Sequence, residues 1–366
     1  MKHTYINASN KLRERIKIAG ITHIAELKEP ALRGIVEEVD KAKLETQEAV
    51  LNYLPDEYTY DQEFAYNVIS KTSQIGAMIG IGNEPPIRDK DAVARRMGEL
   101  AKFGWKDIIT ENELLKLHNP RNDGEFKALV DKLVANGATI VSELRDRINV
   151  TKMQAIATGK VEYDDNNVKV NIDFTEDMPA EHKVVLTGDN TWANPEHDVI
   201  GDLIAWDQQY QDTNGKQADT IFMTRQTQAL LLKNSVIVNE ATGVANSGRG
   251  RVSVDELNSV LGGYGLPSIT IVKKTKANVK NTYTGEVETI ELFPENRVIF
   301  VASGVGKFLL GPTVENKFQP GIVLQAYDKL EPIQSILRAV AMGFPIIENP
   351  NLLLFADVIP ENGAEG

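Results

Sequence analysis

The segment at 303–308, Ser-Gly-Val-Gly-Lys-Phe, comes closest to a chemical motif, because glycine-rich turns followed by lysine can bind phosphate groups. A phosphate-binding loop needs a glycine five positions before the Gly-Lys pair and a serine or threonine directly after it. Val301 and Phe308 occupy those two positions here. The sequence therefore predicts a turn at the end of a strand, without a nucleotide site.

Two acidic groups of residues could suggest metal binding. The run Asp164-Asp165-Asn166-Asn167 lacks the alternate-position ligands, central glycine and final glutamate of a calcium loop, and it favours a hairpin turn. His197, Asp198, Asp202 and Asp207 lie at or near a predicted helix start, where the helix dipole favours carboxylates. Because their spacing matches no familiar metal motif, we expect a solvated helix face there.

The other residues that could act as nucleophiles or bases have no spaced partners. His3, His23, His118 and His182 are scattered along the chain, and no serine lies in a Gly-x-Ser-x-Gly turn. The chain has no cysteine, which excludes disulfides, thiolate metal sites and a cysteine nucleophile. We therefore expect no catalytic residue, no metal site and no cofactor.

The overall composition is that of a globular protein. A length of 366 residues, with 42% hydrophobic and 25% charged residues, favours two packed domains. The net charge of -12 argues against a surface that grips nucleic acid, since phosphate contacts need clustered Lys and Arg. No apolar window of about 18 residues exists, and Met1 to Asn7 lack the apolar run of a secretion signal, so we expect synthesis in a cytoplasm and no membrane contact.

The first part of the chain combines helical and extended patterns. Up to about residue 52, apolar residues at helical spacing predict two short amphipathic helices interrupted by Gly20, Pro30 and Gly34; these residues are Leu12, Ile16, Ile18, Leu32, Ile35, Val36, Val39 and Leu44. β-like composition follows at 64–70 and returns at about 100–110, ahead of an acidic helix start at 110–113.

Between these two extended stretches lies a long segment of unusual composition. Glycines and prolines dominate its first part (Gly76, Gly80, Gly82, Pro85 and Pro86), and basic residues follow (Arg88, Arg95 and Arg96). Loops of this length inside compact domains are uncommon and tend to be functional. If both arms were extended, a hairpin here would reach about 50 Å and would need a partner surface.

The strongest periodic signal in the sequence is an amphipathic helix. Apolar residues recur at steps of three and four at Phe126, Leu129, Val130, Leu133, Val134, Gly137, Ile140, Val141, Leu144 and Ile148. Asp123 is the expected N-cap and Gly159 the expected stop. The helix would be about 50 Å long, and it could bend at 149–151. Leu133, Ile140 and Leu144 are expected to be buried core residues on its apolar face.

The second half of the chain reads as a hairpin followed by a mixed α/β body. A hairpin is expected at 160–172, and Thr224 is the expected cap of a helix that ends near Leu232. Further helices are expected from Pro195 and over 254–261, and strands over 220–223, 269–272, 298–302, 321–327, 333–342 and 352–358.

The order of these parts resembles the major capsid proteins of tailed phages, in particular the lambda-like capsid protein E group with the Hong Kong 97-type fold. The resemblance includes 98–104, 318–327 and 343–347 and covers nearly the whole chain. It implies an α+β fold with an N-terminal arm (1–52), a peripheral domain with a long spine helix (53–63 and 111–194), an extended E-loop (64–110), an axial α/β domain (195–314) and return strands of the peripheral domain with the C-terminus (315–366).

The function implied by the resemblance is structural. Copies of the chain would form hexamers and pentamers of an icosahedral virion shell around double-stranded DNA, without sequence-specific DNA binding, after assembly in a host bacterial cytoplasm. The E-loop residues from Gly76 to Arg96 would contact a neighbouring subunit. No long extra N-terminal region is present, so a separate scaffolding protein and a portal are implied. The alternatives are an encapsulin-type nanocompartment shell and, more remotely, a soluble α/β enzyme with an unrecognised site.

Overall fold

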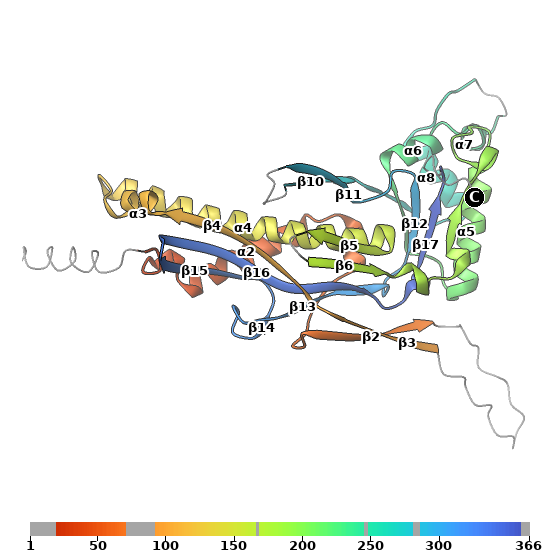
Figure 1. The fold of residues 1–366 in the computed structure, drawn as a ribbon. Helices are drawn as coiled ribbons and strands as arrows, with labels where there is room; N and C mark the ends of the chain where they lie inside the picture. The colour runs from red at the N-terminus through yellow and green to blue at the C-terminus, as the bar shows by residue number, and fades with distance from the viewer. Residues whose placement is uncertain (1–19, 71–91, 166–167, 245–247, 281–285, 360–366) are drawn as a thin grey trace, which may run out of the picture.

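The computed structural model describes residues 20–70, 92–165, 168–244, 248–280 and 286–359. In this part of the chain the strands form a six-stranded sheet, a five-stranded sheet and three separate two-stranded hairpins. Figure 1 shows the six-stranded sheet and a long helix running side by side along an elongated body, with the five-stranded sheet and its helices at one end.

The long helix α4 (Asp123–Thr158) contains 36 residues. At 1.5 Å per residue it extends about 54 Å, and it continues unbroken through the weak point expected at 149–151. Its N-cap is Asn122, whose side chain accepts the Glu125 N–H at 2.8 Å, so the expected cap at Asp123 is wrong by one residue. The expected stop is confirmed, because Gly159 ends the helix with a φ of 69°.

One face of α4 packs on the six-stranded sheet. Leu133, Ile140 and Leu144 are buried there with Leu337 and Ala339 of the central strand β16 (Ile333–Ile347). The N-terminal half of β16 lies between β4 (Ala101–Thr110) and β15 (Val323–Leu330), and its C-terminal half pairs with β13 (Gly306–Thr313). Strand β1 (Asp56–Tyr58) pairs in parallel with β13, and β14 (Gln319–Pro320) completes the sheet.

The N-terminal region packs against α4 and β15 through α2 (Glu29–Glu45), which corresponds to the second expected amphipathic helix. The first expected helix, with Leu12, Ile16 and Ile18, lies outside the described residues. Short 3-10 turns flank α2, at Ala25–Leu27 (η1) and Ala49–Tyr53 (η2). Helix α3 (Glu111–His118) joins β4 to α4 and begins with a capping box between Thr110 and Glu113.

The five-stranded sheet has the order β7 (Lys183–Val185), β17 (Leu353–Asp357), β12 (Arg297–Val301), β8 (Thr220–Thr224) and β9 (Ile269–Val272). The helices of this body are α5 (Val199–Asn214), α6 (Arg225–Leu231), α7 (Ser235–Thr242) and α8 (Val254–Gly263). Thr224 caps α6 as expected, with its hydroxyl accepting the Thr227 N–H. Helix α5 starts at Val199 with Asp198 as its cap, so the expected start at Pro195 is wrong.

The chain crosses between the two sheets twice in its last third. It leaves β12 for β13 through a turn at 302–305, and it leaves β16 for β17 through 348–352, which includes η6 (Pro350–Leu352). Neither expected segment therefore maps onto a single sheet. The segment 195–314 includes β13, which lies in the six-stranded sheet, and the segment 315–366 includes β17, which lies in the five-stranded sheet.

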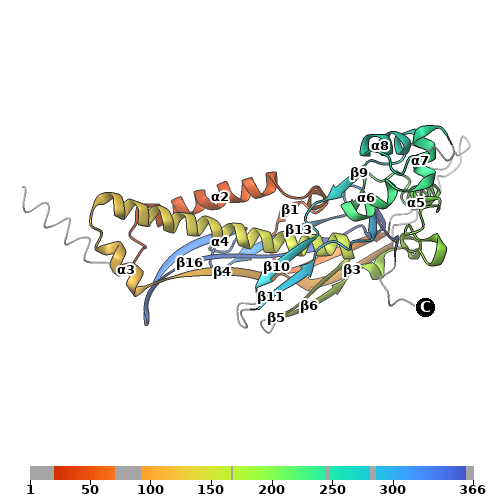
Figure 2. The same cartoon turned by 90° about the horizontal axis from the view of Figure 1, so that it is seen from above.

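Three hairpins extend from this body. They are β2–β3 (Glu63–Ser70 and Ala92–Glu99), β5–β6 (Lys160–Asp165 and Val168–Asp173) and β10–β11 (Lys276–Lys280 and Val287–Glu291). The expected hairpin at 160–172 is confirmed as β5–β6. In Figure 2, β5–β6 and β10–β11 project toward the same side of the molecule.

Candidate assembly surfaces

The glycine-rich segment at 303–306 is a turn between β12 and β13, as predicted. The Asp219 carboxylate accepts both the Ser303 N–H, at 2.7 Å, and the Ser303 hydroxyl, at 2.5 Å, and these bonds lower the pKa of Asp219. The ammonium of Lys307 pairs with Glu57 at 2.9 Å and with Glu348 at 3.2 Å. A carboxylate thus occupies both donors of Ser303, and Lys307 is paired with two glutamates, which disfavours an anion at this turn.

The histidine and aspartates around the start of α5 serve the local structure. Asp202 accepts the indole N–H of Trp192 at 2.9 Å and lies 2.7 Å from His197 Nε2. Asp207 accepts amide groups from Gln211 and Gln217 and is only 6% exposed, so the expected solvated face is wrong at this position. Among the residues that the structure describes, no group of three or more acidic or histidine side chains could hold a metal ion.

The β2–β3 hairpin is one of three two-stranded hairpins in the described chain that join neither of the larger sheets. Its strands pair over eight residues, from Glu63 opposite Glu99 to Ser70 opposite Ala92. In the described part of the chain it pairs with no third strand. At its root the Leu100 N–H donates to the Gln62 carbonyl at 3.1 Å, and Leu100 is buried in the body.

The expected contact residues fall into two groups on this hairpin. Gly76, Gly80, Gly82, Pro85, Pro86 and Arg88 lie outside the described residues. Arg95 and Arg96 lie within β3, opposite Asn67 and Tyr66, although the sequence placed them in the loop. Strand β4 pairs with β16 over ten residues, so the end of the expected 64–110 arm is part of the six-stranded sheet.

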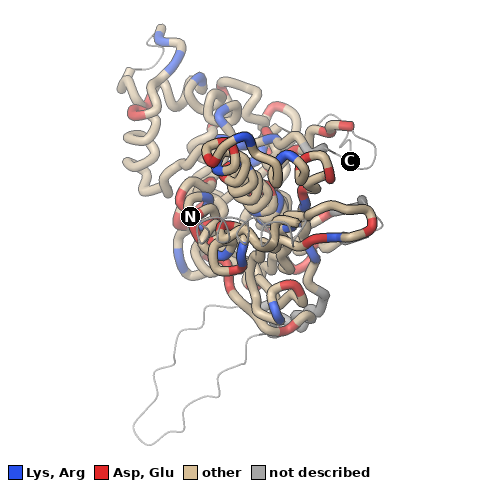
Figure 3. Tube along the Cα trace, turned by 90° about the vertical axis from the view of Figure 1, so that its left-hand side faces the viewer, with Lys and Arg blue, Asp and Glu red and all other residues tan. Residues whose placement is uncertain are grey.

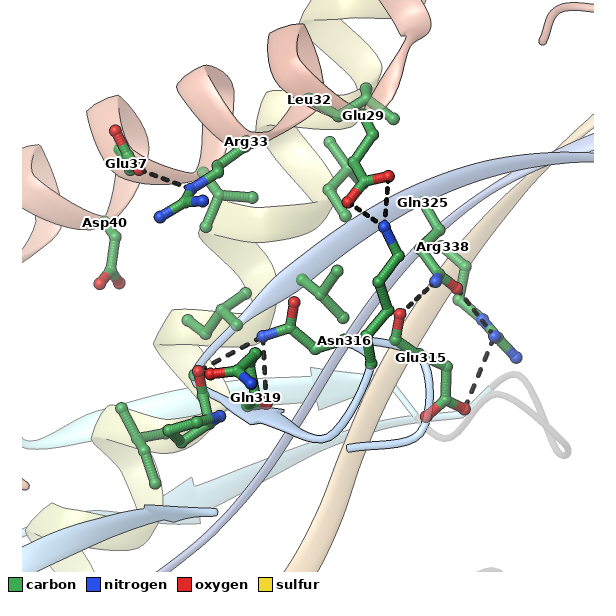
Figure 4. A pocket seen from close by; sticks show the side chains of 18 of the residues that line it. Glu29, Leu32, Arg33, Glu37, Asp40, Glu315, Asn316, Gln319, Gln325 and Arg338 are labelled. Atoms are coloured by element: carbon green, nitrogen blue, oxygen red, sulfur yellow. Dashed lines mark hydrogen bonds and ion pairs between the residues drawn. The ribbon is translucent and has the colours of Figure 1, made fainter. Parts of the chain in front are cut away.

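A groove of about 1450 Å³ lies between α2 and the segment at 315–327 (Figure 4). Lys317 and Glu29 both line it, and the Lys317 ammonium lies 2.6 and 2.7 Å from the two carboxylate oxygens of Glu29. The apolar part of its lining includes Leu27, Leu32, Val36, Leu310, Ile322 and Leu324. Tyr58 and Tyr60 also line the groove and remain 62% and 70% exposed.

The turn beside this groove has a strained backbone. Lys317 and Phe318 both have positive φ angles, 54° and 63°, which is rare for residues with bulky side chains. Hydrogen bonds hold the turn, including Phe318 N–H to the Thr313 carbonyl at 2.9 Å. The Phe318 ring is 64% exposed. Backbone strain of this kind tends to occur where a side chain must be presented for function, and sequence reasoning missed this surface because no periodic pattern marks it.

Charge is not concentrated on the end of the molecule that Figure 3 faces, where Lys and Arg are interspersed with Asp and Glu. No described helix is long and apolar enough to cross a membrane.

Comparisons with known proteins decide the class of this molecule. Residues 51–317 match the profile of the family described as phage major capsid protein E. The chain belongs to this family. No curated protein matches it in sequence. The putative capsid protein of an Escherichia coli CFT073 prophage has a similar structure, with a TM-score of 0.57 at 11% identity over 91% of this chain and 99% of that chain.

Two further structures share less of the geometry. A phage-related protein of Bordetella bronchiseptica RB50 has a TM-score of 0.49 at 9% identity, covering 89% of this chain and 98% of that chain. A virus-like particle from Pyrococcus furiosus has a TM-score of 0.47 at 15% identity, covering 91% of this chain and 100% of that chain.

The family match and the fold confirm the expectation drawn from the order of parts. This capsid protein has the Hong Kong 97-type fold, with α4 as its spine helix, and it is a structural major capsid protein of a phage virion. The family consists of phage capsid proteins, so the nanocompartment alternative gains no support from it.

Proposed function

We propose that this capsid protein assembles with itself into hexamers and pentamers of a closed icosahedral head, and that the β2–β3 hairpin reaches across the adjacent subunit. The observation that carries the proposal is the lack of a third strand beside the hairpin in the described chain. A two-stranded ribbon is marginally stable in water by itself, and it gains stability when another surface covers it. In a shell, that surface belongs to a neighbouring copy.

The composition of the hairpin supports this role. Its strands include Phe64, Tyr66, Val68, Ile69 and Met97, which are more apolar than a solvated ribbon requires. Arg88, Arg95 and Arg96 add positive charge to an otherwise acidic subunit with a net charge of -12. Basic residues at the rim of an interface with an acidic partner mainly raise the association rate.

The exposed aromatic residues beside the groove extend the same contact surface. Tyr58 and Tyr60 directly precede the hairpin. The turn that carries Phe318 continues to Gly321, and a Cβ on this glycine would lie 3.5 Å from Tyr58 Cε1, so the turn lies close to the Tyr58 ring. Aromatic residues are enriched in the cores of protein interfaces. We assign Tyr58, Tyr60 and Phe318 to contacts between copies of this chain.

If the assembled structure is a phage head, several further partners are implied. The shell would enclose double-stranded DNA without gripping it, because a wall with a net negative charge repels phosphate. Assembly would take place in a bacterial cytoplasm, with a separate scaffolding protein and a portal. No feature of the described residues favours a nanocompartment over a head.

Electron microscopy of the purified protein in negative stain, with sedimentation velocity on the same sample, tests this proposal. We expect rings of capsomers or closed shells, because many weak contacts made at once give a stable assembly. A protein that stays monomeric at high concentration, with and without a co-expressed scaffolding protein, would contradict it.

A further inference from the structure

Four charged side chains form a buried network between α2, β1 and α4. Arg145 of α4 binds both oxygens of Asp40 on α2, at 2.5 and 2.7 Å, and one oxygen of Asp56 on β1, at 2.6 Å. Lys152, two turns further along α4, donates to the other oxygen of Asp56. The side chains of Arg145 and Lys152 are each 1% exposed.

The pKa shifts of the two cations have opposite directions, so they do not by themselves make this network a source of stability. Burial lowers the pKa of Lys152 in spite of the adjacent Asp56 carboxylate. Burial also opposes the charge of Arg145, but the hydrogen bonds and charges of Asp40 and Asp56 outweigh it and raise the pKa of Arg145. Replacing such networks with apolar residues of similar volume is often neutral or stabilising, whereas the directed bonds of the ions can select one geometry.

The network lies beside the segment of chain that leads into the β2–β3 hairpin. Strand β1 is an edge strand with only three paired residues, Asp56 to Tyr58 opposite Phe308 to Leu310. Lys152 lies over the Phe308 ring at 5.3 Å, and the Phe308 N–H donates to the Pro55 carbonyl at 2.8 Å. The β2–β3 hairpin begins at Glu63, a few residues after this anchor.

Arg145 also holds α2, which has few fully buried residues. Only Leu32 and Val36 of this helix are buried. Besides the Arg145–Asp40 pair, Lys43 of α2 bonds to Asp146 of α4 at 2.8 Å. Arg145 therefore links the position of α2 to the position of β1 through one guanidinium group.

We propose that Asp56, Arg145 and Lys152 are positioning residues that fix the direction in which the β2–β3 hairpin leaves the spine helix, and that Asp40 couples this direction to α2. The inference rests on the proposed function, because the direction of the hairpin matters for assembly only if the hairpin contacts another subunit. Without the network, the subunit folds, but the hairpin root samples several orientations and docks slowly on its neighbour.

The experiment uses the absence of cysteine in the chain. Spin labels on Gln62→Cys, at the hairpin root, and Glu143→Cys, on the exposed side of α4, report the distance between the two elements in unassembled subunits. The test variant replaces the network with apolar residues: Asp40→Leu, Asp56→Leu, Arg145→Met and Lys152→Met. We expect an unchanged melting temperature, a distance distribution about twofold broader, and shell formation slowed about tenfold.

Two further variants keep the test decisive. If the fourfold variant does not fold, the pair Asp56→Asn and Lys152→Met removes the hairpin anchor and retains the Arg145–Asp40 pair. The conservative change Lys152→Arg keeps a cation at this position and should leave the distribution as narrow as in the unmodified protein. The matched control, Arg33→Met with Glu37→Leu, removes an ion pair from the exposed face of α2, where the two side chains are 80% and 67% exposed, and should change neither quantity.

The outcomes separate this inference from the proposed function. A narrow distance distribution in a folded network variant overturns the positioning role, whether or not shells form. A broad distribution with a normal assembly rate overturns the coupling between hairpin direction and assembly. If the unmodified protein forms no shells, the proposed function fails, and the distance measurement alone still decides whether the network positions the hairpin.

Discussion

The spine helix with its sheet and the β2–β3 hairpin represent two different ways of using the same chain. Helix α4 packs on β16 through buried residues such as Leu144 and Ile148, so this face of the helix is covered within one subunit. The hairpin has eight pairs of its own and no third strand in the described residues. We therefore expect folding of the subunit and assembly of the shell to depend on separate segments, which mutations can separate.

The largest expected effect comes from breaking α4. Leu144→Pro removes a backbone donor, clashes with the preceding turn and costs about 3 kcal/mol or more, and the lost burial of Leu144, which is 3% exposed, adds to this. Since domains are stable by only about 5–15 kcal/mol, we expect insoluble protein. Solubility and circular dichroism measure this, with Glu143→Ala on the exposed side of the helix as the control. A soluble Leu144→Pro protein with a native spectrum would show that α4 does not organise the subunit.

Removing the hairpin should have the opposite result, a folded subunit that cannot assemble. The Gln62 carbonyl and the Leu100 N–H are hydrogen-bonded, so an Asn-Gly turn can join these two residues in place of 63–99. We expect an unchanged circular dichroism melting curve and no closed shells in light scattering and electron microscopy. Loss of the native fold together with assembly would mean that the hairpin belongs to the subunit core.

Reversing two charges on β3 should give a smaller effect, confined to the assembly rate. Arg95→Glu with Arg96→Glu should slow assembly about tenfold at low salt and much less near 0.5 M salt, because screening weakens interactions between exposed charges. Time-resolved light scattering at several salt concentrations measures this. The pair Lys127→Glu and Lys132→Glu, on the exposed side of α4, makes the same change in net charge. An equal delay with this control would assign the effect to net charge instead of to the hairpin.

The smallest expected effect is a loss of stability at acidic pH, caused by His182 beside the five-stranded sheet. His182 is 0% exposed, its Nδ1 lies 2.8 Å from the Leu353 carbonyl oxygen, and burial lowers its pKa. In the unfolded chain this histidine binds a proton below about pH 6.5, whereas the folded state resists protonation. Stability should therefore decline as the pH falls below that value.

Urea unfolding at several pH values between about 7.5 and 5.5 tests the role of His182. The decline should be shallower in His182→Gln and unchanged in the variant without the hairpin. A decline of the same size in His182→Gln would remove His182 as its cause.

The sequence predicts the local features of this fold well. The periodicity of α4, its end at Gly159 and the cap of α6 at Thr224 depend on residues within a few positions of each other. The start of β3 at Ala92 was missed because Arg95 and Arg96 do not resemble a strand. Asn122 and Asp123 are adjacent and both suited to capping, so the sequence alone could not choose between them.

Features that depend on distant residues could not be predicted in this way. Strand β17 pairs with β12, about 55 residues earlier, and nothing in 353–357 indicates which sheet it joins. The buried network unites Asp40 with Arg145, 105 residues apart, and Asp56 with Lys152, 96 residues apart. Arg145 and Lys152 look like ordinary helix surface residues, and only the packing of three elements around them reveals their burial.

We propose that the hairpin is stabilised by a neighbouring subunit, whereas α4 is stabilised within its own. Hydrogen–deuterium exchange on free subunits and on assembled shells tests this claim most directly. We expect amides of β2 and β3 to exchange rapidly in free subunits and to become protected in shells, while amides of α4 exchange slowly in both. Hairpin amides that are as protected as those of α4 in the free subunit would contradict it.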